Sequence, residues 1–214
     1  GGGEVARYIV WSDTKVSVQL GLSVASGNIV ITTPDGSATG PDSFTLRSGN
    51  FYFVSLTGSD STGIINDINR PFRTPNYVVR DLSSFKEGDF VIVRGGTYDL
   101  DDGTNNIYSG SFLRVNKSGT LTNPMTFMGY PGETVNIQID TPNKLISNYE
   151  VITDWVVSGF VVSINHCQSG NVLSFGGPTT SAICQDTTGA IGGKATRIRV
   201  VNIGIDGHDV GGLC

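Results

Sequence analysis

The chain has 214 residues, of which 29 are Gly and only 15% are charged, and its net charge is −5. This length suits one large domain or two small ones. Phosphate binding needs a clustered basic surface, so the acidic balance argues against a nucleic-acid partner. The sequence contains no run of about 18 apolar residues and therefore predicts no membrane span.

Glycine and small polar residues are spread along the whole chain, without a long amphipathic helical stretch. This pattern predicts many short strands joined by turns. No signal peptide is visible, and we expect both ends to be cuts through a longer protein. The three cysteines, Cys167, Cys184 and Cys214, leave two alternatives open: a disulfide between Cys167 and Cys184, or cysteines that are buried as small hydrophobic residues.

Residues 5–47 alternate between apolar and polar positions. Val16, Val18 and Leu20 share one face of a predicted strand, and Ile29 and Ile31 repeat the pattern. Period-two alternation predicts half-buried strands. We therefore expect antiparallel strands in a small sandwich.

Three motifs in residues 4–47 resemble the second half of an IPT/TIG immunoglobulin-like domain. In order, they are Trp11-Ser12-Asp13-Thr14-Lys15-Val16, Ser26-Gly27-Asn28-Ile29-Val30 and Thr33-Pro34-Asp35-Gly36. The last motif is also a strong turn signal. The resemblance implies a partial immunoglobulin-like β-sandwich over residues 1–48, which would serve as a spacer or adhesive module of an extracellular protein.

Residues 51–140 carry an ordered set of motifs that resembles the N-terminal cap and first coil of right-handed parallel β-helix proteins. The motifs are Phe51-Tyr52-Phe53-Val54-Ser55, Arg70-Pro71-Phe72-Arg73-Thr74, Val93-Arg94-Gly95-Gly96-Thr97-Tyr98, Asn123-Pro124-Met125-Thr126-Phe127 and Gly129-Tyr130-Pro131-Gly132-Glu133. The resemblance implies an all-β fold, with a right-handed parallel β-helix over residues 49–214. Proteins of this kind include polysaccharide lyases, other carbohydrate-active enzymes and many surface proteins.

A short helix is predicted over residues 75–85, where Val78, Val79, Leu82 and Phe85 share one face. The resemblance implies that this helix caps the first coil. Later apolar segments read as further coils, each of which buries its apolar residues only by stacking on the next coil. Residues 176–193 read as a long loop.

The candidate catalytic residues are Lys194, Arg197 and Arg199. Positions 197 and 199 point the same way from a strand. A lyase acting on a uronate needs a Lys or Arg base to take the proton from the carbon next to the carboxylate. It also needs a positive charge beside the carboxylate to neutralise it. The alternative is a pair of arginines on an exposed sheet face that pair with nearby acids.

The candidate metal ligands are Asp206 and Asp209, in the segment Asp206-Gly207-His208-Asp209. Two carboxylates at a strand end suit Ca²⁺, and the segment resembles an element near the calcium sites of β-helix pectate lyases. The alternative is a solvated turn. For Trp155 we expect core packing rather than stacking on a sugar ring, and for Asp60 and Asp67 a structural role.

Two functions follow from these observations. One is an extracellular carbohydrate-active protein, secreted or at the cell surface, acting as a lyase on an acidic polysaccharide with Ca²⁺ as the expected cofactor. The other is a non-catalytic adhesion, stalk or glycan-binding protein. Fold alone does not decide between them.

Overall fold

The structure is a computed structural model that describes residues 5–20, 24–100, 111–139, 144–148, 151–164, 173–174, 195–201 and 203–207. The chain divides into two compact units, Gly1–Ser48 and Gly49–Cys214. Both units are built from β-strands with almost no helix, in agreement with the all-β prediction. No helix of the described residues is long and apolar enough to cross a membrane.

The described residues of the first unit form two antiparallel strand pairs, in agreement with the prediction for residues 5–47. Strand β1 (Val5–Trp11) pairs with β2 (Val16–Leu20), and β3 (Gly27–Thr33) pairs with β4 (Gly36–Phe44). The expected half-burial of Ile29 and Ile31 is wrong, because their exposed fractions are 56% and 43%. Among the described residues of this unit, none belongs to a buried core. A two-stranded sheet without a second layer leaves both of its faces in water.

The second unit contains three sheets in which every described strand pair is parallel. The five-stranded sheet runs in the order β15 (Ala195–Val201), β12 (Ile152–Ser158), β9 (Met125–Gly129), β6 (Phe90–Val93) and β5 (Phe51–Val54). The four-stranded sheet runs in the order β16 (Gly204–Gly207), β13 (Val161–Ile164), β10 (Val135–Ile139) and β7 (Gly96–Asp99). The three-stranded sheet runs in the order β14 (Leu173–Ser174), β11 (Lys144–Asn148) and β8 (Ser111–Val115).

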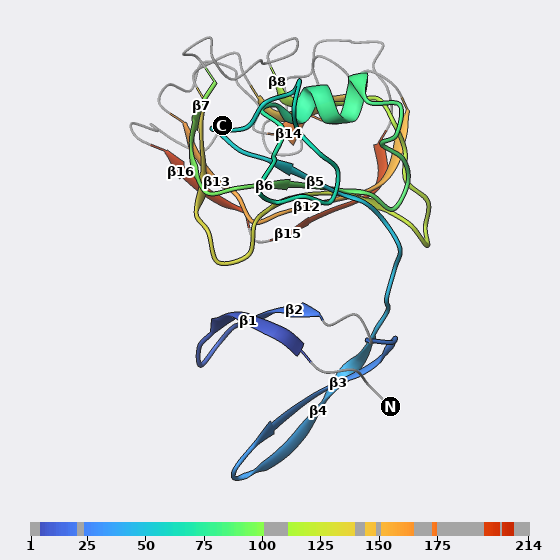
Figure 1. The fold of residues 1–214 in the computed structure, drawn as a ribbon, viewed down its shortest axis with the longest axis vertical. Coiled ribbons are helices and arrows are strands. Elements are labelled where there is room, and N and C mark those ends of the chain that lie inside the picture. Colours follow the sequence, from blue (N-terminus) through green and yellow to red (C-terminus); the bar gives the residue numbers. More distant parts are fainter. Residues whose placement is uncertain are drawn as a thin grey trace. The chain divides into compact units, whose positions relative to one another are not determined.

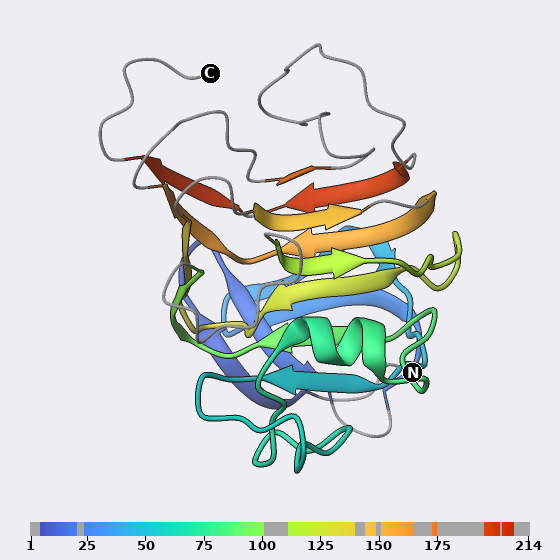
Figure 2. The same ribbon diagram turned by 90° about the horizontal axis from the view of Figure 1, so that it is seen from above.

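From β6 onward the chain visits the five-, four- and three-stranded sheets in turn (Figure 1). Each turn of the chain therefore adds one strand to each sheet, and strands of successive turns lie side by side (Figure 2). The parallel strands that we predicted within residues 49–214 are found in the parts of that range that the structure describes.

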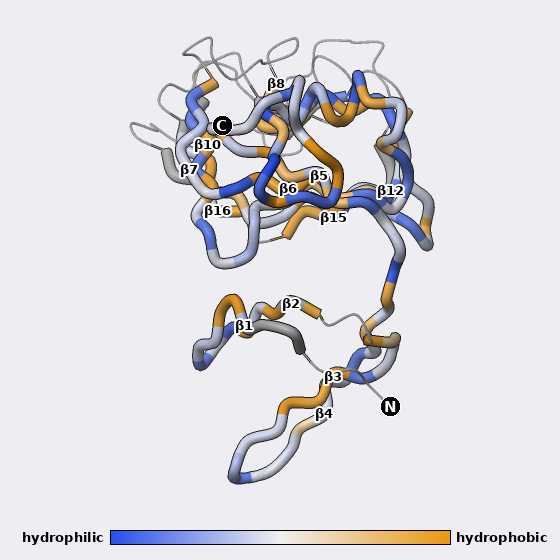
Figure 3. Tube along the Cα trace, viewed as in Figure 1, coloured by the Kyte–Doolittle hydropathy of each residue, from blue (hydrophilic) through white to orange (hydrophobic). Residues whose placement is uncertain are grey.

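The core lies inside these three sheets because equivalent inward residues stack from turn to turn. Tyr52, Val91, Phe127 and Val157 share one register column of the five-stranded sheet, and all four are fully buried. Figure 3 shows hydrophobic residues along β5 and β6. A residue that no single turn could bury alone is thus covered by its counterparts above and below.

The predicted helix is present but shorter than residues 75–85. The π-helix η1 (Tyr77–Asp81) follows two α-helical residues, and Leu82 is already extended. The buried residues of η1 are Val78 and Val79. Figure 1 shows the helix near β8, which is the edge strand of its sheet. The side-chain amide of Asn76 donates to the Ser111 carbonyl at 3.0 Å and accepts from the Arg114 N–H at 2.8 Å. The helix start thus covers the edge of β8.

Asp60 and Asp67 have structural partners, as expected. The Asp60 carboxylate accepts hydrogen bonds from the Arg73 and Thr74 backbone at 2.8 and 3.0 Å, and from the Thr74 hydroxyl at 2.8 Å. Asp67 forms an ion pair with Arg70 at 2.7 Å. These contacts hold the segment between β5 and η1.

Candidate functional site

Strands β12 and β15 depart from extended backbone at matching positions. They pair in parallel, with Thr153 opposite Thr196 and Trp155 opposite Ile198. Between these pairs lie Asp154 and Arg197, whose φ angles are 60° and 54°. Asp tolerates this left-handed conformation, whereas Arg adopts it less readily. The two residues therefore interrupt the strands at the same place, in consecutive turns of the chain.

Asp154 and Arg197 form a bidentate ion pair. The Arg197 Nε donates to Asp154 Oδ1 at 2.6 Å, and Nη2 donates to Oδ2 at 2.6 Å. Two parallel charge-assisted bonds of this kind fix the guanidinium in one orientation. The Asp154 side chain is 3% exposed, whereas the Arg197 side chain is 55% exposed. The carboxylate thus lies behind a guanidinium that still faces solvent.

Each partner of the pair shifts the pKa of the other. The hydrogen bond from Arg197 lowers the pKa of Asp154. The same bond, accepted by Asp154, raises the pKa of Arg197. Arg197 therefore stays protonated and suits anion binding, but it is not a proton acceptor.

A loop before β9 supports Asp154 from the other side. The Gly119 N–H donates to the Thr153 carbonyl at 3.0 Å, and the Thr153 N–H donates to the Ser118 hydroxyl at 3.1 Å. A Cβ atom on Gly119 would lie 2.5 Å from the Asp154 carbonyl oxygen, so only glycine fits there. The indole N–H of Trp155 donates to the Lys117 carbonyl at 2.8 Å. Trp155 is fully buried, which confirms the prediction that it packs in the core.

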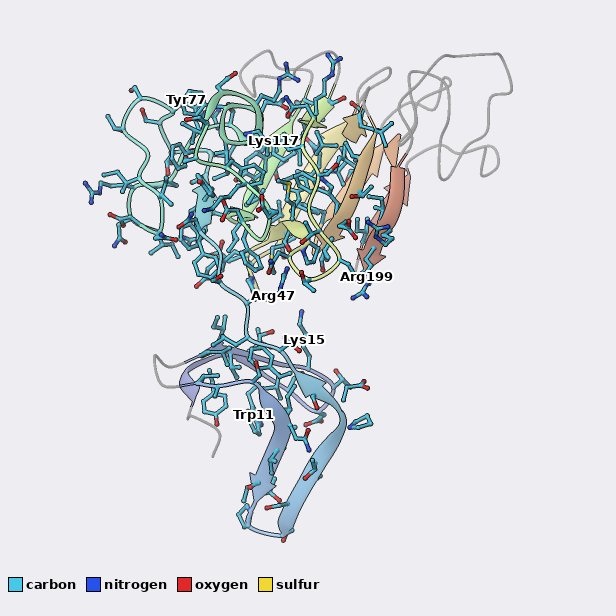
Figure 4. The ribbon with its side chains drawn as sticks, turned by 90° about the vertical axis from the view of Figure 1, so that its right-hand side faces the viewer. Trp11, Lys15, Arg47, Tyr77, Lys117 and Arg199 are labelled. Carbon is cyan, nitrogen blue, oxygen red and sulfur yellow. The ribbon has the colours of Figure 1, made fainter. Side chains whose placement is uncertain are left out.

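The ion pair lines a cavity of about 240 Å³, which we call the arginine pocket. Its lining residues are Leu121, Pro124, Asp154, Trp155, Val156, Arg197, Ile198 and Arg199. Arg199 lies opposite Val156 in the register of β15 and β12. Figure 4 shows its side chain at the outside of the strand stack. Among the residues that the structure describes, Arg199 forms no ion pair.

The pocket combines an apolar wall with positive charge. Leu121, Pro124 and Val156 supply the wall. Arg197 and Arg199 each bring a guanidinium, and Asp154 cancels one of the two charges. The arrangement suits an anionic ligand that also has an apolar face.

The structure brings two of the predicted site residues together. Arg197 and Arg199 line the same pocket, although the left-handed backbone at Arg197 breaks the simple strand alternation from which their common direction was predicted. The ion pair with Asp154 also agrees with the alternative in which such arginines pair with nearby acids. Lys194 and Asp209 lie outside the described residues.

Asp206 lies on β16, in the four-stranded sheet, where it is in register with Ser163. It therefore lies in a different sheet from β12 and β15, which carry Asp154 and the two arginines of the pocket. In the described part of the chain, no group of three or more His, Cys, Asp or Glu residues is placed to hold a metal ion. The calcium site at Asp206 and Asp209 stays a prediction. The three cysteines, His208 and residues 176–193 also lie outside the described residues.

Asp154 is the pocket residue that the sequence analysis missed. It lies in the middle of an apolar strand, and its partner is 43 residues further along the chain. The one available signal is a lone acidic residue between Ile152 and Trp155, in a segment that is otherwise typical of a buried strand.

Comparison with known proteins adds little. No protein family and no curated protein matches the chain. Among solved structures the chain resembles one described as a rhamnogalacturonan lyase, with 20% sequence identity and a TM-score of 0.43. The match covers 62% of this chain and 34% of that chain, so it spans about a third of the matched protein.

Proposed function

We propose that the chain is a carbohydrate-active protein whose second unit is a right-handed parallel β-helix and whose arginine pocket binds an acidic polysaccharide. The β-helix is supported by the regular succession of three parallel sheets and by the motif resemblance in residues 51–140. The observation that carries the function is the arginine pocket itself, with Arg199 beside the ion-paired Arg197.

The chemistry of the pocket matches an acidic sugar. A guanidinium binds a carboxylate through two parallel N–H donors, and Arg199 has these donors available toward solvent. The C–H face of a sugar ring can lie against Leu121, Pro124 and Val156. A neutral sugar would leave the cationic side of the pocket without a partner.

Lyase activity is the finer form of this proposal. Elimination next to a uronate carboxylate needs a positively charged group beside the carboxylate. It also needs a base that takes the proton from the adjacent carbon atom. Arg199 would supply the charge, and Arg197 would add hydrogen bonds through its outer N–H groups. Because Arg197 is held protonated, we assign the base to Lys194, as the sequence suggests. No step of this proposal depends on a metal ion, and calcium binding by Asp206 and Asp209 is a separate proposal.

The second candidate is a non-catalytic glycan-binding or stalk protein. The specific observation in its favour is that Asp154 already neutralises one of the two arginines. In both cases we place the protein outside the cell or on its surface, because long acidic polysaccharides occur there.

The test measures binding and cleavage in parallel. The 214-residue chain is titrated with polygalacturonate, alginate and neutral dextran, and unsaturated product is followed by ultraviolet absorbance with and without a chelator. We expect binding of the acidic polymers only. Arg199→Gln should weaken binding by at least about tenfold, as expected for the loss of a charge-assisted hydrogen bond.

Arg70→Gln is the matched control, because it removes the same charge from an exposed position elsewhere in the second unit. The proposal would be overturned if the protein bound neither of the two acidic polymers. It would also be overturned if Arg199→Gln bound them with the same affinity as the unchanged protein. Binding with product formation identifies a lyase, and binding without product identifies a glycan-binding protein. Loss of activity on chelation would support the separate calcium proposal.

A further inference from the structure

We infer that Asp154 determines which anions the arginine pocket accepts, favouring sugars with a single carboxylate over sugars with several sulfate groups. This inference rests on the proposed function and names a residue outside the predicted site set. Asp154 acts through Arg197 and is therefore a positioning and specificity residue.

The arginine pocket has a net positive charge. Its ionised residues are Arg197, Arg199 and Asp154, so the net charge of the lining is +1. The carboxylate of Asp154 is almost completely covered, and both of its oxygens accept from Arg197. A ligand thus meets a neutralised guanidinium at Arg197 and, at Arg199, a guanidinium that pairs with no acid among the described residues.

Arg197 keeps part of its hydrogen-bonding capacity in the ion pair. A guanidinium has five N–H donors, and Asp154 takes the two that point back toward β12. Arg197 can still donate to a ligand through its outer N–H groups, but it adds no net charge. Hydrogen bonds without additional charge suit a carboxylate with one negative charge. A sulfated sugar with two or three negative charges needs a more positive pocket.

The left-handed backbone at position 154 can be kept when the charge of Asp154 is removed. Asn adopts positive φ at least as readily as Asp, so Asp154→Asn keeps the local conformation at φ 60°. The Asn Oδ1 can still accept one hydrogen bond from Arg197. The substitution therefore removes the charge while it preserves the shape, and it raises the net charge of the pocket to about +2.

The experiment compares two trisaccharides over a range of salt concentrations, one with a single galacturonate carboxylate and one with three sulfate groups. For Asp154→Asn we expect the affinity ratio of the sulfated ligand to the carboxylated ligand to rise by about tenfold at low salt, with a steeper salt dependence for the sulfated ligand. A purely structural role for Asp154 would weaken both ligands together and leave the ratio unchanged.

Asp67→Asn is the matched control, because Asp67 also forms an ion pair with an arginine, at 2.7 Å, but away from the pocket. It should leave the ratio unchanged. Arg197→Gln provides a second test in the opposite direction, since it leaves Asp154 uncompensated and should weaken the sulfated ligand more than the carboxylated one. This variant keeps the inference testable if Asp154→Asn does not fold.

The outcomes separate the two proposals. If the unchanged protein binds neither ligand, the proposed function fails and this inference fails with it. If the unchanged protein binds the carboxylated trisaccharide and folded Asp154→Asn has the same selectivity ratio as Asp67→Asn, this inference alone is overturned. The same holds if Arg197→Gln shifts the ratio toward the sulfated ligand.

Discussion

Arg94 and Glu133 form an ion pair that joins equivalent corners of two consecutive turns of the chain. The Arg94 Nε lies 2.9 Å from Glu133 Oε2, and Nη2 lies 2.5 Å from Oε1. The Gly95 N–H donates to the same carboxylate at 2.6 Å, and the guanidinium lies 4.8 Å from the centre of the Tyr130 ring. The two motifs that carry these residues are therefore structural, and they fasten the turn between β6 and β7 to the turn between β9 and β10.

Glu133→Gln should destabilise the second unit in a pH-dependent way. The hydrogen bond from Arg94 lowers the pKa of Glu133 in the folded protein. Its stabilising effect is thus complete above the unfolded carboxyl pKa of about 4.3, and it is lost as the pH falls through the lower folded-state pKa. We expect a loss of about 1–2 kcal/mol in the free energy of unfolding at neutral pH, and a difference that shrinks toward zero in acid.

Urea unfolding at a series of pH values measures this difference. Glu87→Gln is the control, because Glu87 is exposed and forms no ion pair among the described residues. A deficit of Glu133→Gln that is as large in acid as at neutral pH would contradict the assignment.

Asn76→Ala should leave backbone groups at the edge of β8 without a hydrogen-bond partner. The Asn76 amide is buried and serves both the Ser111 carbonyl and the Arg114 N–H. Its removal leaves two backbone groups without this partner, so we expect a loss of about 2–4 kcal/mol. Chemical unfolding measures the loss, and amide hydrogen exchange at Arg114 should accelerate. Asn69→Ala, at an exposed position, is the control, and equal stability of the two variants would rule out the edge-capping role.

The sequence predicted which segments become strands, but not the contacts between consecutive turns. Asn76 and Arg114 are 38 residues apart, Arg94 and Glu133 are 39 apart, and Asp154 and Arg197 are 43 apart. The corners between strands differ in length, so the turn has no fixed period in the sequence. A left-handed residue inside a strand is also invisible to a period-two reading, which is why Asp154 was missed.

In the first unit, the sequence pattern predicts the strands but not their burial. Alternation in β3 correctly predicts a strand, but it states only which side of a strand could be buried. Whether a second layer exists depends on residues far away in the chain, and the described residues of this unit provide none. Ile29 and Ile31 consequently lie in water despite their pattern.

Ile31→Lys should reduce self-association of the protein. Strand β3 lies at a sheet edge, carries no charged residue and exposes three consecutive apolar side chains, Ile29, Val30 and Ile31. Such an edge pairs readily with other chains, and a lysine on it opposes that pairing. Light scattering as a function of concentration checks the expectation. Thr62→Lys adds the same charge at an exposed position of the second unit, and an equal effect of both variants would show that net charge, not β3, controls association.

Gly119→Ala should disturb the arginine pocket from behind. The added Cβ would lie 2.5 Å from the Asp154 carbonyl oxygen and 2.7 Å from the Met125 nitrogen, so backbone has to move. We expect a loss of about 1–3 kcal/mol in the free energy of unfolding, together with weaker polygalacturonate binding because Asp154 and Arg197 shift.

Gly204→Ala is the matched control in the same unit. Its added Cβ would meet only the Val161 Cγ2, at 3.9 Å, which is an ordinary contact. We expect its stability to stay within about 0.5 kcal/mol of the unchanged protein, with unaltered binding. Chemical unfolding and ligand titration of both variants decide the matter. If Gly119→Ala matches Gly204→Ala in both measurements, the loop around Gly119 does not support Asp154 in the way that the distances indicate.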